Sequence, residues 1–435
     1  MSAHDLIARQ HEGPVDAASA ARLASDGLRL VRLADDDDRA FDGWQAAVTR
    51  GFLGDEPSDV QRETGRGLRG HRRMIAVLDD SIPQPEVPVG TLASWVAELS
   101  VPGGVVDSCA ISSVTVAPTH RRRGIWRAMM EGELRTAAAL GLPVASLTVS
   151  ESTLYGRFGF AQAVTAASIE IDVKRASWAG PAPSGRVDFI PRERWREHAP
   201  ELFDSIRRVT PGEAEMPRGH LDRFAGTRAD AEKPGHTRAV QYTAASGEIT
   251  GLALYSVEEN HDDFTRSSVT IANLMAADAD AYAGLWRFFI EMDLIGTVRA
   301  SELAVDEPLL WMISDRRAAT LTLRDHHYLR VLDTPALLGS RRYEGAGSVV
   351  LDVHDPLDLA GGRFRLTVGE DGAASVARTE DAAGARLGVA ELAAIVLGQV
   401  SAVTLAAAGR IDAEDPVALA RLFGWHRPVR LSYWY

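Results

Sequence analysis

The stretch SSVTVAPTHRRRGIWRAMM, Ser112–Met130, decides how this chain is interpreted. A β-branched run, Val114–Val116, predicts a strand, and the spacing of apolar residues after Gly124 predicts an amphipathic helix. The first N–H groups of a helix have no partners and carry about half a positive charge, so a helix that begins beside arginines suits phosphate. The sequence therefore predicts an anion-binding turn, in a chain whose formal net charge is −13.

Length and composition indicate a multidomain globular protein. The chain has 435 residues, of which 46% are hydrophobic and 25% charged. No window approaches the roughly 18 uninterrupted apolar residues of a membrane span, and no signal-peptide pattern opens the chain. The single cysteine, Cys109, leaves no intramolecular disulfide framework and suits a reducing cytoplasm; we interpret it as a small buried hydrophobe rather than a nucleophile. The acidic balance argues against nucleic acid as the main partner.

Hydrophobic patterning divides the chain into a tail and three units. Residues 1–25 are rich in Ala, Ser and Asp and predict a loosely attached tail. Residues 26–162 alternate strands and helices in the order β-α-β-β-β-α-β-α-β, which predicts a mixed α/β domain. Residues 163–320 repeat much of that order, with an acidic segment where the first unit has its arginines. Residues 321–435 predict a compact α+β domain.

Other patterns carry less functional information. Gly65–Gly70 (GRGLRG) formally matches G-x-G-x-x-G, but it precedes a strand instead of following one, so we interpret it as a mobile loop. Arg62–Gly65 repeats the R-x-x-G spacing without the strand–turn–helix context. His326 and His327 would point to opposite faces of a strand, and no His or Cys set with ligand spacing accompanies them. No metal site is therefore predicted.

The segment VTVAPTHRRRGI resembles motif A of the GNAT superfamily of N-acetyltransferases, whose R/Q-x-x-G-x-G/A loop holds the pyrophosphate of acetyl-CoA. Arg121 and Gly124 fit the fixed positions of that loop, whereas Trp126 replaces its final small residue. Within the superfamily the chain is more closely similar to the Eis (enhanced intracellular survival) acetyltransferases of actinobacteria. That similarity rests on the same segment, on YGRFGF (Tyr155–Phe160), on DEPLLWMISDRR (Asp306–Arg317) and on the aromatic C-terminus.

This resemblance, which extends from about Asp26 to the C-terminus, implies tandem GNAT-like mixed-sheet domains followed by a sterol-carrier-protein-like α+β domain. After the flexible tail of residues 1–25, the active GNAT domain would span 26–162 and a degenerate second copy 163–320. The sterol-carrier-protein-like domain would span 321–435 and end in the active site. The resemblance also implies a homo-oligomer, a hexamer.

The resemblance further implies which residues hold acetyl-CoA, the co-substrate. The strand before the loop would contact the pantetheine arm through its backbone, and the loop with the first helical turn would cradle the pyrophosphate. The end of the following strand would face the thioester. These residues are Val114, Thr115, Val116, Arg121, Arg122, Arg123, Gly124, Ile125, Trp126, Arg127, Ser150 and Glu151. We expect Trp126 to pack beside the loop and shape the pyrophosphate turn.

Two tyrosines would carry the chemistry. Tyr155 matches the family's general acid, which protonates the departing CoA thiolate. The general base in the family is the α-carboxylate of the last residue, here Tyr435, where the family has phenylalanine. From the residues alone, Tyr155 also fits a packing role, and the terminal RLSYWY also fits a strand that completes the last domain.

The resemblance implies direct transfer of an acetyl group from acetyl-CoA to amines of polyamine-like substrates such as aminoglycosides, and we expect the protein to act in the cytoplasm. Asp55, Glu56 and Asp306 are candidate acidic contacts for a cationic acceptor. Lysine-containing peptides are an alternative acceptor. Other classes also stay open: a lipid or sterol carrier that uses the C-terminal domain, and a regulator that binds acetyl-CoA without turnover. Neither nucleic acid nor a membrane is expected as a partner.

Overall fold

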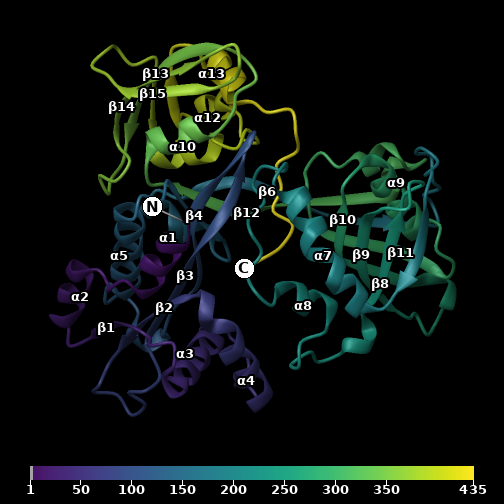
Figure 1. Cartoon of the computed structure of the whole chain (residues 1–435), viewed down its shortest axis with the longest axis horizontal. Coiled ribbons are helices and arrows are strands. Elements are labelled where there is room, and N and C mark those ends of the chain that lie inside the picture. Colours follow the sequence, from purple (N-terminus) through teal and green to yellow (C-terminus); the bar gives the residue numbers. More distant parts are fainter. Residues whose placement is uncertain (1–2) are drawn as a thin grey trace. The chain divides into compact units, whose positions relative to one another are not determined.

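The chain forms two compact units, which a computed structural model describes over residues 3–435. The first unit contains residues 3–163, His327–Trp425 and Tyr435. The second contains Val164–His326 and His426–Trp434. Figure 1 follows the chain from its purple N-terminal helices to its yellow C-terminal segment. No helix in residues 3–435 is long and apolar enough to cross a bilayer.

The first unit is built on a sheet in the strand order β1-β2-β3-β4-β5-β12. Neighbouring strands are antiparallel except β4 and β5, which are parallel and are joined by the crossover helix α5 (Ile125–Ala139). From β12, residues His327–Val331 pair with β5. The strands are β1 (Arg29–Arg32), β2 (Arg73–Leu78), β3 (Gly90–Val101), β4 (Gly104–Val116), β5 (Val144–Thr148) and β12 (Ala319–Val331).

Helices pack on this sheet around an apolar core. The acidic run Asp35–Asp38 lies where helix α3 (Asp38–Gly51) begins, and the side chain of Asp37 caps that helix by accepting the N–H of Ala40. Cys109 on β4 is fully buried, and burial raises the pKa of its thiol well above the usual value. Besides α5, the helices are α1 (Ala3–Glu12), α2 (Ala17–Ala24), α3 (Asp38–Gly51), α4 (Asp59–Leu68) and α6 (Ser152–Tyr155), with 3-10 turns η1 (Arg69–His71), η2 (Pro118–His120) and η3 (Gly156–Phe158).

The prediction of a loose tail over residues 1–25 is wrong for the part of it that the structure describes, which forms the packed helices α1 and α2. The Ser19 hydroxyl donates to the carbonyl of Ala128 on α5 at 2.7 Å. Arg135 of α5 pairs with Asp16 at 2.7 Å. Helices this short are marginal in isolation, so their stability comes from tertiary packing that composition does not reveal.

The GRGLRG segment is also ordered, contrary to the prediction of a mobile loop. Its first residues lie in α4 and the rest in η1. A reciprocal capping box between Ser58 and Gln61 begins α4. Such a box satisfies two N–H groups of the first turn and sets where the helix begins.

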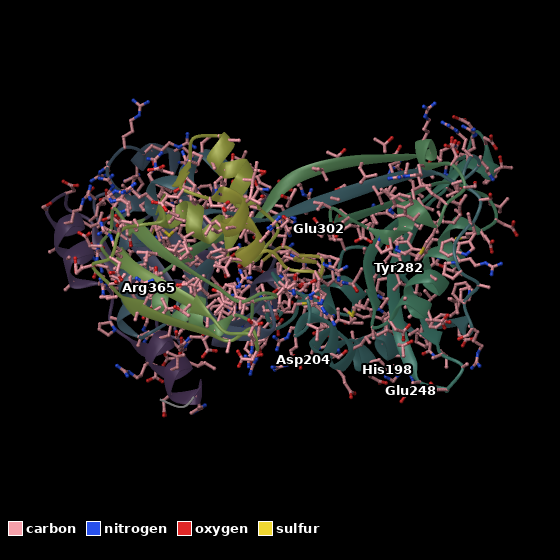
Figure 2. All side chains as sticks on the ribbon, turned by 90° about the horizontal axis from the view of Figure 1, so that it is seen from above. His198, Asp204, Glu248, Tyr282, Glu302 and Arg365 are labelled. Atoms are coloured by element: carbon pink, nitrogen blue, oxygen red, sulfur yellow. The ribbon has the colours of Figure 1, made fainter. Side chains whose placement is uncertain are left out.

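Residues 334–425 form a separate lobe of the first unit, around a sheet in the order β15-β14-β13-β16-β17. Figure 2 marks this lobe by Arg365, which lies on β14. Its strands are β13 (Gly347–His354), β14 (Gly362–Val368), β15 (Ala374–Arg378), β16 (Ala385–Gly388) and β17 (Ile411–Ala413). Its helices are α10 (Thr334–Ser340), α11 (Val389–Ile395), α12 (Ala402–Ala407) and α13 (Pro416–Phe423).

A buried ion pair joins this lobe to the rest of the first unit. Arg330 on β12 donates to Asp355 at 2.6 Å, and neither side chain has exposed surface. The Arg330 guanidinium also donates to the carbonyl of Phe158 at 2.5 Å. Asp355 in turn accepts backbone N–H groups of the loop that follows it. Both charges are therefore fully hydrogen-bonded in the interior, where an unpaired charge is very costly.

The second unit repeats the sheet pattern in the order β6-β11-β10-β9-β8-β7. Only β10 and β11 are parallel among these neighbours, and α9 (Ala279–Ile290) crosses between them as α5 does between β4 and β5. Tyr282 of α9, labelled in Figure 2, donates to the buried Glu307. The other elements are β6 (Ala161–Asp172), β7 (Arg186–Ile190), β8 (Arg238–Thr243), β9 (Ile249–Glu258), β10 (Ser267–Ala276), β11 (Ile295–Leu303), α7 (Arg192–Arg207), α8 (His220–Ala225), η4 (Pro234–His236), η5 (Phe264–Arg266), η6 (Pro308–Trp311) and η7 (Arg316–Ala318).

The ion pair between Arg330 and Asp355 predicts a large stability effect. Arg330→Met should lower the free energy of unfolding by about 3–5 kcal/mol, because it leaves a buried carboxylate without its cation. The control is Arg386→Met, which breaks an exposed pair with Asp412 and should cost about 1 kcal/mol or less. Urea denaturation measures both. Equal losses in the two variants would contradict the importance of the buried pair.

Candidate functional site

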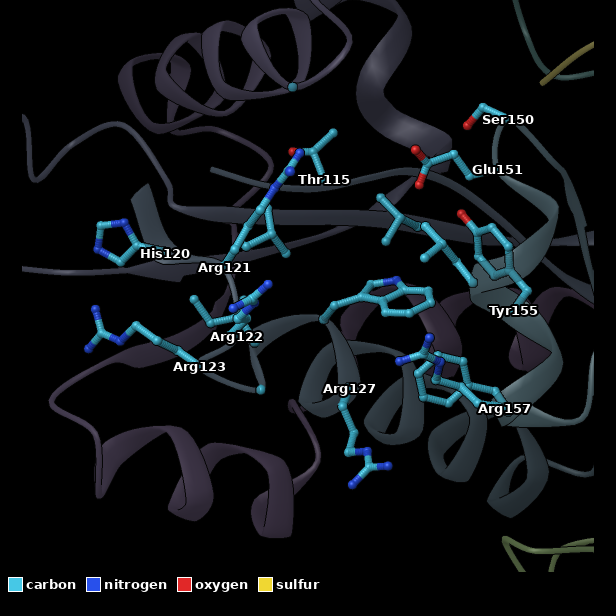
Figure 3. A pocket seen from close by; sticks show the side chains of 18 of the residues that line it. Thr115, His120, Arg121, Arg122, Arg123, Arg127, Ser150, Glu151, Tyr155 and Arg157 are labelled. Atoms are coloured by element: carbon cyan, nitrogen blue, oxygen red, sulfur yellow. The ribbon is translucent and has the colours of Figure 1, made fainter. Parts of the chain in front are cut away.

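A cavity of about 1000 Å³ lies in the first unit, where β4 ends, α5 begins and α6 follows β5. Every residue that the sequence assigns to the co-substrate lines it, and so does Tyr155. In Figure 3 the arginines of the turn lie on one side, and Ser150, Glu151 and Tyr155 lie on the other. The cavity therefore joins a basic end to an end that carries the hydroxyl of Ser150, the carboxylate of Glu151, the phenol of Tyr155 and the guanidinium of Arg157.

The end of β4 is irregular, and this irregularity shapes the cavity wall. Ser113 has φ 55°, and the pairing of β4 with β3 shifts register beside it. A regular strand points alternate side chains to opposite faces, whereas a bulge redirects them. Consecutive residues Val114, Thr115 and Val116 consequently all line the cavity.

The turn between β4 and α5 depends on left-handed backbone. Arg122 has φ 66° and Gly124 has φ 74°, and α5 begins at the next residue. A Cβ atom on Gly124 would lie 2.6 Å from Nη2 of Arg22. The left-handed backbone therefore favours glycine at position 124, and a Cβ there would have to displace the end of the exposed Arg22 side chain.

In the part of the chain that the structure describes, two of the four arginines at the turn make ion pairs with carboxylates, and the other two do not. Arg123 pairs with Asp79 at 3.3 Å and donates to the carbonyl of Asp26 at 2.9 Å. Arg127 pairs with Glu131 one turn further along α5. Arg121 and Arg122 are exposed, and neither makes an ion pair with any group in residues 3–435. Their charge is available to an anion in the cavity.

A buried carboxylate behind the turn holds it in place. Asp79 accepts hydrogen bonds from Ser81, His120 and Arg123. These bonds, those from Ser81 foremost, hold the pKa of Asp79 well below its usual range. The carboxylate therefore stays ionised and fixes both the cavity-lining His120 and the side chain of Arg123.

Tyr155 is buried at the other end of the cavity. Burial, assisted by the nearby carboxylate of Glu151, raises the pKa of its phenol to about 12. The Trp126 ring meets Tyr155 edge to face at 5.5 Å and Phe158 at 4.8 Å between centroids. Trp126 thus packs beside the turn and reaches across to support the Tyr155 ring.

Tyr435 does not line this cavity and lies instead against β5. Its hydroxyl donates to Ser146 at 2.8 Å and lies 2.7 Å from Nε2 of His327. The Thr148 hydroxyl donates to the main-chain oxygen of Tyr435 at 2.7 Å. Burial raises the pKa of the Tyr435 phenol, so the hydroxyl stays neutral. The ring also meets Trp95 edge to face at 5.5 Å between centroids.

The strand β5 links Tyr435 to the cavity. Ser146 and Thr148 lie on β5, and Ser150 and Glu151, which follow it directly, line the cavity. Thr148, which binds the main-chain oxygen of Tyr435, is thus only two residues before the cavity-lining Ser150.

Each of the paired histidines has its own partner. Nε2 of His326 lies 3.1 Å from the carbonyl of Tyr433, and both residues belong to the second unit. His327 belongs to the first unit, where it faces Tyr435. Within residues 3–435 no group of three His, Cys, Asp or Glu side chains is placed to hold a metal ion.

Several cavity residues were not predicted from the sequence. His120, Arg157 and Phe158 lie within the recognised motifs and Leu154 directly adjoins one, so position in the sequence was a usable signal. The remaining ones come from distant segments and had no such signal: Arg22, Asp26, Gly51, Phe52 and Leu53. The candidate acidic contacts Asp55 and Glu56 are exposed after α3 and do not line the cavity, and Asp306 belongs to the second unit.

Comparison with protein families matches the three predicted kinds of domain. Residues 31–163 match an acetyltransferase (GNAT) domain, and residues 218–331 match a second acetyltransferase (GNAT) domain. Residues 334–432 match a sterol carrier protein domain. The chain thus contains tandem GNAT domains followed by a sterol-carrier-like domain; the predicted boundaries at 162 and 320 stay predictions.

Individual relatives extend over most of the chain. It is 40% identical to an uncharacterized N-acetyltransferase of Streptomyces avermitilis, over 74% of this chain and 79% of the relative. It is 35% identical to N-acetyltransferase Eis of Mycobacterium tuberculosis, over 82% of this chain and 88% of that protein. The crystal structure of Eis1 from Mycobacterium abscessus superposes with a TM-score of 0.80 at 25% identity, covering 94% of this chain and 100% of Eis1.

The geometry of Gly124 predicts a specific loss. Gly124→Ala should lower the free energy of unfolding by about 1–2 kcal/mol, the cost of a left-handed non-glycine residue, and should weaken CoA binding by displacing Arg22. The control is Gly67→Ala in α4, where no atom lies within 4 Å of the added Cβ. That variant should be neutral or up to about 1 kcal/mol more stable. Urea denaturation and calorimetric titration with CoA measure both effects; unchanged CoA affinity in Gly124→Ala would contradict the assignment of the turn.

Proposed function

Because the chain belongs to the Eis family of GNAT N-acetyltransferases, we propose that it moves the acetyl group of acetyl-CoA directly onto amines of small polyamine-like molecules such as aminoglycosides. That it is an acetyltransferase follows from the family; the acceptor and the roles of individual residues are the proposal. One observation carries it. Arg121 and Arg122 bring unneutralised charge to the start of α5, in a cavity that extends to the buried phenol of Tyr155.

The cavity fits the chemistry of the donor. Phosphates suit the basic end, where exposed guanidinium groups and the first N–H groups of α5 converge. The β4 segment Val114–Val116 supplies a wall for the pantetheine arm. Bound acetyl-CoA supplies an activated acyl group, and holding it beside the acceptor replaces a bimolecular encounter by a positioned one.

Tyr155 is the proposed general acid. A donor must keep its proton at the working pH, and the raised pKa of about 12 ensures this for Tyr155 throughout the neutral range. The packing of Trp126 against the Tyr155 ring restricts where the hydroxyl points. The phenol would give its proton to the departing thiolate.

The terminal carboxylate of Tyr435 is the proposed general base, which takes the proton from the attacking amine. Supporting this role, the side chain is held by Ser146 and His327 and the main-chain oxygen by Thr148. The Thr148 contact restricts the main-chain end of Tyr435 itself, and the other two contacts anchor its ring, which limits the freedom that the carboxylate must lose. Tyrosine in place of the family's phenylalanine is accommodated because its hydroxyl has buried polar partners.

The Tyr155 end of the cavity carries the guanidinium of Arg157 and one carboxylate, Glu151, which would be the contact for a cationic acceptor. Glu151 is an exposed carboxylate on the cavity wall, beside Tyr155. The whole chain carries a formal net charge of −13, which favours the approach of polycations at low ionic strength. The homohexamer implied by the family resemblance and the cytoplasmic location expected from the single cysteine stay predictions.

The proposal is tested by CoA release from acetyl-CoA with a panel of acceptors. Kanamycin and spermine should each give saturable CoA release, and a neutral polyol without amines should give none. A lysine-containing peptide in the same panel tests the alternative acceptor class. Release with the peptide alone would move the proposal from small polyamines to protein lysines, and no release with any amine would contradict the proposal.

The role assigned to Tyr435 makes a separate prediction. Two residues added after Tyr435 convert its carboxylate into an amide, so kcat should fall by about a hundredfold or more. Acetyl-CoA affinity should not change. The matched control is Tyr435→Phe, which keeps the terminal carboxylate and loses only the hydroxyl contacts, and which should retain most of the activity. Full kcat in the extended protein would remove the carboxylate from the mechanism.

A further inference from the structure

An arginine from outside the acetyltransferase motif also lines the cavity. Arg22 lies on α2, ahead of the segment 31–163 that matches the GNAT domain. We propose that Arg22 binds a phosphate group of acetyl-CoA and that the N-terminal segment of residues 3–26 is a built-in part of the donor site. This inference rests on the proposed function, since it requires that the cavity binds acetyl-CoA.

Arg22 is placed at the point where phosphate would bind. Its Nη2 lies 2.6 Å from where a Cβ of Gly124 would be, so its guanidinium lies directly against the residue that precedes α5. The side chain is exposed, and it makes no ion pair with any group in residues 3–435. Arg121 and Arg122 are likewise unpaired and line the same cavity. Like charges that share a cavity repel one another until an anion neutralises them.

The position of Arg22 is fixed by how α2 packs on α5, beside which it lies in Figure 1. Asp16 directly precedes α2, and its carboxylate both caps the helix and pairs with Arg135 of α5. Ser19, one turn before Arg22, donates to a carbonyl of α5. Gly132 of α5 permits this approach, because a Cβ there would lie 2.8 Å from the Ser19 hydroxyl.

A second set of contacts anchors the connection between α1 and α2. Arg73 on β2 has no exposed surface and donates to the carbonyls of Gly13 and Pro14. Its charge is balanced by Glu133 of α5 at 3.3 Å. Removal of the N-terminal segment would leave buried donors of Arg73 without acceptors, which is costly. The segment is therefore part of the folded unit, not an appendage.

The end of the segment also supports the cofactor turn. The carbonyl of Asp26, four residues after Arg22, accepts a hydrogen bond from Arg123 at 2.9 Å. Asp79 holds the same guanidinium from the other side. Arg123 is therefore held by structural contacts, and the cations beside the turn that make no ion pair within residues 3–435 are Arg22, Arg121 and Arg122.

The ligand chemistry is a phosphate of the nucleotide end of the donor, either the pyrophosphate or the 3′-phosphate. Acetyl-CoA and acetyl-3′-dephospho-CoA distinguish these. If Arg22 binds the 3′-phosphate, its removal weakens only acetyl-CoA; if it binds the pyrophosphate, its removal weakens both ligands equally. Either pattern supports a phosphate contact.

Isothermal titration calorimetry of the full-length protein tests the inference without requiring turnover. Arg22→Ala should raise the dissociation constant of acetyl-CoA by about three- to tenfold, the range for a solvent-exposed charge-assisted contact. Arg22→Lys should lie between Arg22→Ala and the wild type. The matched control, Arg39→Ala, removes an exposed arginine of α3 that does not line the cavity and should bind as the wild type does. Circular dichroism verifies that each variant is folded.

The outcomes separate this inference from the proposed function. Wild-type affinity in Arg22→Ala, or an equal loss in Arg39→Ala, would overturn the role of Arg22 and leave the acetyltransferase proposal intact. Failure of the wild type to bind acetyl-CoA would overturn both. A loss confined to Arg22→Ala, partly restored by lysine, is the result expected.

Discussion

The site depends on positive charge that the chain does not neutralise at the start of α5. Three of the nearby guanidinium groups have no anionic partner within residues 3–435, although carboxylates outnumber basic groups in the chain. Asp79, which lies directly behind the turn, binds Arg123 and His120 and leaves Arg121 and Arg122 free. The left-handed backbone at Arg122 costs about 1–2 kcal/mol of folding free energy. This strained conformation occurs at the turn that presents the unpaired arginines to the cavity.

The tandem architecture provides an internal comparison for this interpretation. Both units place a crossover helix between parallel strands, α5 in the first and α9 in the second. The start of α9 is occupied by the chain itself, because Asp278 caps it and Asp280 accepts bonds from Ser184 and Tyr242. Carboxylates there satisfy the helix dipole and repel phosphate. The same local fold thus carries an anion-binding turn in one unit and a self-capped turn in the other.

Local sequence signals predicted the turn between β4 and α5. They could not predict how segments that are distant in the sequence pack together. The strand before Pro118, the helix after Gly124 and the position of Tyr155 follow from periodicity and a recognised motif, and all lie at one cavity. The packed helices α1 and α2 were missed because their stability comes from α5 and Arg73, which lie about a hundred and about sixty residues away in sequence.

The sequence also could not predict that residues 327–425 belong to one compact unit with residues 3–163, because that grouping rests on long-range contacts such as the ion pair between Arg330 and Asp355. The anchoring of Tyr435 shows the same limit. The aromatic residues that precede Tyr435 in the sequence suggest that it is buried, but no local sequence pattern connects it with Ser146 on β5. The sequence therefore identified the site residues that lie within continuous motifs. The structure added the contacts made by residues near the two ends of the chain, such as Arg22 and Tyr435.

A crystal structure of the protein with CoA tests the central claim most directly. We predict the pyrophosphate on the backbone and side chains of Arg121–Arg127, with the pantetheine arm along Val114–Val116 and no nucleotide at the start of α9. A pyrophosphate bound elsewhere, or a cavity at α5 that stays free of CoA at saturating concentration, would contradict the assignment of the donor site.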